Sequence, residues 1–112
     1  MKRSVLLLTI LLIVSLTLAA CGRPKAPADW DVTVEVDGRS AIVSITVPDF
    51  QIGRDYHPHL RLNGGPEVMV YQDPYIFRTL SPGQYELWVE IADPRHNPFP
   101  GLEPRILTFE IK

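Results

Sequence analysis

Cysteine and excess basic charge are the two things that this sequence most clearly lacks. Cys21 is the single cysteine among 112 residues, so the chain cannot form an internal disulfide or a cysteine-based metal site. Its 11 basic side chains stand against 13 acidic ones and form no visible cluster, which argues against nucleic acid as a partner. The length is that of one small domain and excludes a multidomain enzyme.

The first 20 residues lack acidic, aromatic and proline residues altogether, although the rest of the chain contains all 13 acids and all 11 prolines. Lys2 and Arg3 precede a long apolar stretch that ends in Ala19 and Ala20, which is the layout of a secretory signal. We therefore expect an exported protein. The alternative is an uncleaved membrane anchor, although roughly 16 apolar residues fall short of the ~20 that a spanning helix needs.

The stretch Leu18-Ala19-Ala20-Cys21 resembles the lipobox of bacterial lipoproteins. The resemblance implies cleavage before Cys21 and lipidation of its thiol. Residues 1–20 would then be the lipoprotein signal peptide, 21–29 the lipidated cysteine and a tether, and 30–112 the folded domain. We expect the domain in the bacterial cell envelope, outside the cytoplasm, where two or three acyl chains on Cys21 would hold it on a membrane.

Beyond the tether, apolar residues alternate with polar ones at a period of two, which is typical of half-buried strands. Turns rich in glycine and proline separate these segments, and Asp37-Gly38 predicts a hairpin between the first two. The pattern predicts an all-β, immunoglobulin-like antiparallel β-sandwich of about seven strands. The predicted strands are residues 32–36, 41–47, 56–63, 67–72, 75–78, 85–91 and 105–111.

The segment Leu80-Ser81-Pro82-Gly83-Gln84-Tyr85-Glu86-Leu87 resembles the turn that enters the sixth strand of fibronectin type III and immunoglobulin-like domains. The resemblance makes Tyr85 a tyrosine corner, whose hydroxyl bonds back to the preceding backbone. Its expected role is structural.

The three histidines lie on segments that this fold would bring together. In the immunoglobulin strand order, residues 56–63 and 85–91 are antiparallel neighbours. With Leu60 directed at the core, alternation places His57 and His59 together on the outer face. The loop that leaves residues 85–91 carries His96 and ends beside the start of the histidine strand. We therefore predict that His57, His59 and His96 meet at one end of the sheet.

Three imidazoles suit zinc or copper(II), with copper favoured by intrinsic affinity. Asp93, Asp55 and Glu90 are candidates to complete the coordination or to orient a ring. Met69 is the only methionine beyond the signal segment, so a sulfur-rich copper(I) site is not expected. The competing interpretation is that His57 and His59 decorate an exposed edge, because Pro58 between them cannot donate to a strand ladder.

A further resemblance favours the metal site. Residues 56–64, 74–75, 80–85 and 93–98 resemble a recurrent pattern of small exported bacterial β-sandwich domains of unknown function. That pattern pairs a His-x-His strand with a later Asp-x-x-His loop. Asn63 stands where aspartate is usual and Tyr85 where a histidine often follows the Pro-Gly turn, so one possible extra ligand is missing.

No catalytic residue is predicted, and we expect a protein that is not an enzyme. The serines beyond the signal segment have no evident base beside them in the sequence. Glu86 and Glu90 would lie about 13 Å apart along a strand, which is too far for the usual carboxylate pair.

The alternative to metal binding is an interaction module that contacts an envelope protein or polymer. Trp88 and Phe99 would form its contact surface, because exposed tryptophan is favoured at such interfaces. A structural interpretation instead packs Trp88 beneath the loop of residues 97–104.

Overall fold

The computed structural model describes residues 26–112, so the predicted signal peptide, Cys21 and most of the tether lie outside the described residues. Within this range the chain forms seven strands and no helix, so it offers no helix long and apolar enough to cross a membrane. The strands are β1 (Asp31–Asp37), β2 (Ser40–Thr46), β3 (His57–Leu62), β4 (Val68–Met69), β5 (Tyr75–Phe77), β6 (Gly83–Ala92) and β7 (Arg105–Ile111).

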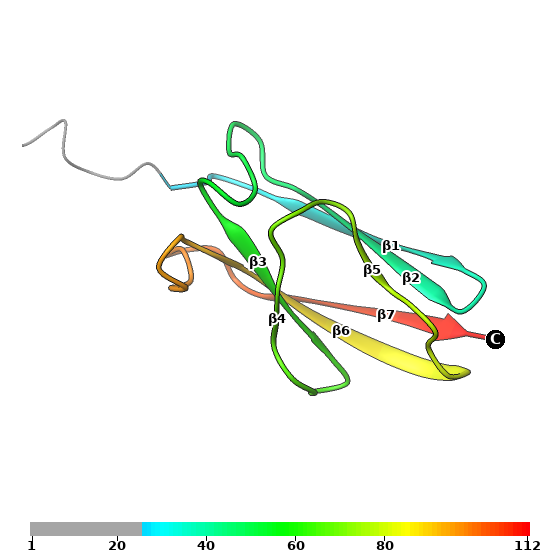
Figure 1. Ribbon diagram of the computed structural model, residues 1–112. Coiled ribbons are helices and arrows are strands. Elements are labelled where there is room, and N and C mark those ends of the chain that lie inside the picture. Colours follow the sequence, from blue (N-terminus) through cyan, green and yellow to red (C-terminus); the bar gives the residue numbers. More distant parts are fainter. Residues whose placement is uncertain (1–25) are drawn as a thin grey trace, which may run out of the picture.

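The strands form two antiparallel sheets, with the orders β1-β2-β5 and β4-β3-β6-β7. Figure 1 shows them as two layers, with β1 and β2 above β6 and β7. The predicted all-β sandwich is confirmed. Its third, sixth and seventh strands share one sheet, as the immunoglobulin-like order requires.

The core lies between the sheets and follows the alternation of the sequence. Side chains at every second position of β2, and of β6 from Leu87 onward, are at most 4% exposed. Each fully buried aliphatic side chain contributes roughly 1.5–3 kcal/mol to folding. These inward residues are Ala41, Val43 and Ile45 of β2 and Leu87, Val89 and Ile91 of β6.

Tyr85 forms the predicted tyrosine corner. Its hydroxyl donates a hydrogen bond to the carbonyl oxygen of Ser81 at 2.6 Å. Its ring stacks on Phe109 of β7, with centroids 5.2 Å apart. These contacts tie the turn before β6 to the sheet.

The interpretation of the histidine strand as an irregular or exposed edge is wrong, because β3 lies between β4 and β6. Pro58 is buried, and its carbonyl oxygen accepts a hydrogen bond from the Val70 N–H at 2.9 Å. In an antiparallel ladder the N–H and C=O of one residue face the same neighbour. The missing donor of Pro58 therefore faces the short strand β4, and the longer ladder with β6 is undisturbed.

The start of β3 and the end of β6 lie at the same end of the sandwich, where His57 pairs with Ala92. The start of β1 lies there too, since Asp31 pairs with Thr46 at the end of β2, just before the loop to β3. In Figure 1 this is the end at which the described chain begins and the loop after β6 turns back.

Candidate metal centre

The outer face of β3 is covered by the segment around β4. The strand pairing sets Met69 opposite His59, and the side chains of Glu67 and Tyr71 on either side of it contact Arg61 and His57. The covering explains why His57 and His59 are only 2% and 3% exposed although they point away from the core. The pairs are Arg61 with Glu67 in a 2.7 Å ion pair, His59 with Met69 in register, and His57 with Tyr71 in a stack with centroids 5.1 Å apart.

His96 reaches the site from a compact loop after β6. One carboxylate oxygen of Asp93 accepts the N–H groups of Arg95 at 2.8 Å and Asn97 at 3.0 Å. The His96 N–H donates to the carbonyl oxygen of Asp93 at 2.9 Å. His96 itself has φ of +69°, in the left-handed region that non-glycine residues seldom adopt. Asp93, predicted beside the metal, thus builds the loop that presents His96.

The three imidazoles converge on one point. His57 Nε2 lies 2.8 Å from His96 Nδ1 and 2.9 Å from His59 Nε2. The three potential ligand atoms all lie within 4.8 Å of one another. Nitrogens that share a tetrahedral zinc at 2.0–2.1 Å stand about 3.3 Å apart. The two short contacts therefore need to open by about 0.5 Å, and the widest separation, at most 4.8 Å, needs to close by up to about 1.5 Å. The three histidines could therefore hold a metal ion.

The protons of this cluster show why it suits an ion. His59 Nδ1 lies 3.0 Å from Glu67 Oε1. With its one hydrogen on Nδ1, toward this carboxylate, neutral His59 carries a lone pair on Nε2. His57 Nε2 faces that lone pair and also His96 Nδ1. In the neutral cluster, His57 Nε2 has either one hydrogen or one lone pair for both contacts. A metal ion would instead use one lone pair from each ring.

The environment keeps His57 in its neutral, ligating form. Burial lowers the pKa of His57, and the neighbouring rings of His59 and His96 lower it further, against the smaller opposing effect of Asp93 and Glu67. Neutral imidazole is the form that binds metal.

The structure places the carboxylates differently from the prediction. Glu90 lies opposite His59 in register, with an oxygen 3.9 Å from His59 Nδ1. Asp55 instead pairs with Arg54 at 3.1 Å, and this contact lowers the pKa of its carboxyl group. Glu67, which holds His59 most closely, was missed by sequence reasoning, although the alternation of residues 67, 69 and 71 carried a signal for it.

The two residues of the predicted contact surface do not share a face. Trp88 is half-buried on the outer face of β6, where the Arg61 guanidinium lies 5.7 Å above its ring and exposed Ile106 is its register partner on β7. Phe99 packs against the core and meets Phe50 edge to face at 6.5 Å. The Arg61 guanidinium thus covers part of the Trp88 ring.

No known protein-family model and no curated protein matches this chain. The resemblances to the lipobox and to exported β-sandwich domains therefore rest on the sequence motifs alone. The support for the metal site is the positions of its three histidines.

Proposed function

We propose that this protein is an exported, lipid-anchored protein that binds one transition-metal ion, zinc or copper, through His57, His59 and His96. We further propose that it acts by binding rather than by catalysis. The two rings on β3 are 2% and 3% exposed, which admits an ion after a small opening but leaves little surface for a larger substrate.

The convergence of three ring nitrogens is the observation that carries the metal proposal. Polar groups buried on the outer face of a sheet cost free energy unless their hydrogen bonds are satisfied. Here one nitrogen, His57 Nε2, makes two short contacts at 2.8 and 2.9 Å with a single hydrogen or a single lone pair. The Glu67 carboxylate at 3.0 Å adds the usual partner of a metal-bound histidine, since such rings commonly donate their second N–H to a carboxylate.

The anchoring part of the proposal is supported by sequence alone. Cys21 follows the apolar stretch directly and is the only cysteine of the chain, as expected for a residue reserved for lipidation. One acyl chain binds a membrane only marginally, whereas two or three hold it stably. Cell-envelope localisation follows from the same motif.

The test is calorimetric titration of the full chain, purified in detergent, with zinc and with copper(II) at neutral pH. We expect uptake of one ion per chain by the parent protein. The decisive variant is His96→Gly, because glycine accepts the φ of +69° without strain and the ring lies on an exposed loop. This variant should keep the fold and lose affinity by about tenfold or more.

A second readout is thermal unfolding. An ion at 100 times its dissociation constant should raise the free energy of unfolding by about 2.7 kcal/mol. Asp55→Asn is the matched control, because its carboxylate is engaged by Arg54, and it should bind as the parent does. Absence of heat and of thermal stabilisation in the parent protein, with both metals, would refute metal binding.

A further inference from the structure

Met69 is the one methionine among the described residues, and the register places it directly beside the histidine cluster. Pro58 gives its carbonyl to β4, so His59 and Met69 form a non-hydrogen-bonded pair. In such pairs the Cα atoms are about 4.5 Å apart and the side chains lie closest. The thioether and the His59 imidazole therefore stand next to each other on the same face.

The side chain of Met69 is not used by the core. It is 46% exposed and forms part of the wall of an open hollow of about 410 Å³. Methionine can rotate about three bonds and carries a polarisable sulfur, so side-chain rotation can present the sulfur to an ion.

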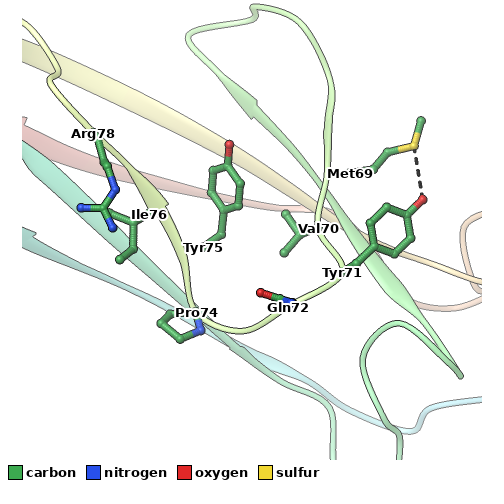
Figure 2. A pocket seen from close by; sticks show the side chains of 8 residues that line it. All are labelled: Met69, Val70, Tyr71, Gln72, Pro74, Tyr75, Ile76 and Arg78. Atoms are coloured by element: carbon green, nitrogen blue, oxygen red, sulfur yellow. Dashed lines mark hydrogen bonds between the residues drawn. The ribbon is translucent and has the colours of Figure 1, made fainter.

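Tyr71 connects this sulfur to the cluster. Its hydroxyl lies 3.7 Å from the Met69 sulfur, a contact drawn in Figure 2. Its ring stacks on His57 with an interplanar angle of 22°. A thioether sulfur has two lone pairs, so it can accept this weak hydrogen bond and still coordinate a metal. The ring that covers His57 thus also holds the sulfur at the margin of the site.

We infer that Met69 supplies a fourth ligand and that the ion of this site is copper, held in its cuprous form by three imidazoles and one thioether. This inference rests on the proposed histidine site. Thioether ligands select copper(I), whereas zinc in proteins is bound by cysteine, histidine and carboxylate. The sequence argued only against a sulfur-rich copper(I) site, and one thioether beside three imidazoles is a different ligand set.

The test compares the affinities of the full chain for copper(I) and zinc, measured by competition with chromophoric chelators under anaerobic, reducing conditions. Met69→Leu preserves size and apolarity at an exposed position. We expect it to weaken copper(I) binding by about tenfold or more and to leave the zinc affinity within about twofold. X-ray absorption of the copper(I)-loaded parent should show one sulfur scatterer that is absent in Met69→Leu.

Tyr71→Phe is the matched second variant, since it keeps the stack on His57 and removes only the hydroxyl that holds the sulfur. It should weaken copper(I) binding less than Met69→Leu does. A parent protein that binds metal with no sulfur scatterer, and with equal copper(I) affinity in Met69→Leu, would overturn this inference and leave the histidine site intact. A parent protein that binds neither metal would overturn both.

Discussion

The outward side chains of the two sheets differ in their exposure to solvent. On β1 the outward residues Thr33 and Glu35 are exposed, as solvated strand positions usually are. On β3 the outward residues His57 and His59 are as buried as the core. A sandwich of this size needs only its inner faces to fold, and burial of polar rings opposes folding. The second sheet therefore carries buried polar rings that the sandwich does not need in order to fold and that the proposed metal site would use.

The strongest way to break this contrast is the double variant His57→Leu with His59→Leu, which gives β3 an apolar outer face. Metal affinity should fall by more than about 100-fold, because two of three ligands are gone. The free energy of unfolding of the metal-free protein should stay unchanged or rise by up to about 2 kcal/mol, since the two buried rings are replaced together and the partners left behind, Glu67 and His96, are exposed to water. Titration and chemical denaturation measure the two effects. A loss of several kcal/mol would instead make the rings structural.

A smaller effect on metal affinity is expected from Glu67→Gln. This variant sharpens the contrast between the two sheets, because it keeps all three histidines and changes only the group that orients His59. The glutamine amide keeps the size of the side chain and an oxygen that can accept a hydrogen bond. It removes the negative charge that lies 3.0 Å from His59 Nδ1. Metal affinity should fall by about tenfold while the fold is kept. Glu90→Gln is the control, because its oxygen is 3.9 Å from the same nitrogen and not 3.0 Å. Equal losses in both variants would mean that general negative charge, and not orientation by Glu67, governs binding.

The smallest effect is expected on the free energy of unfolding, from a hydrogen bond far from the histidines. Tyr85→Phe removes the hydroxyl that donates to Ser81 at 2.6 Å and keeps the ring on Phe109. The free energy of unfolding should fall by about 1 kcal/mol, the usual net value of one hydrogen bond. Metal affinity should not change, which chelator competition can check. A coupled loss of metal binding would show that the turn before β6 and the site are not independent.

Alternation in the sequence was enough to predict the sandwich and much of the candidate site. Period-two patterning put His57 and His59 on one face, and antiparallel pairing of β3 with β6 brought His96 to them. Glu67 and Tyr71 escaped prediction because they flank a strand of two residues, whose register follows from packing and not from periodicity. Pro58 wrongly suggested an exposed edge. Its position without an N–H faces the short strand β4, so the longer pairing of β3 with β6 loses no hydrogen bond.

The end of the sandwich that bears the histidines is also the end from which the chain leads back toward Cys21. Only four residues lie between Cys21 and Ala26, so the five steps from one to the other reach at most about 18 Å. With Cys21 lipidated as proposed, the ion would be held close to the bilayer surface rather than displayed to the surrounding fluid. A protein that exchanges metal with this one would then have to meet it at the lipid headgroups, either from within the membrane or from a similar tether.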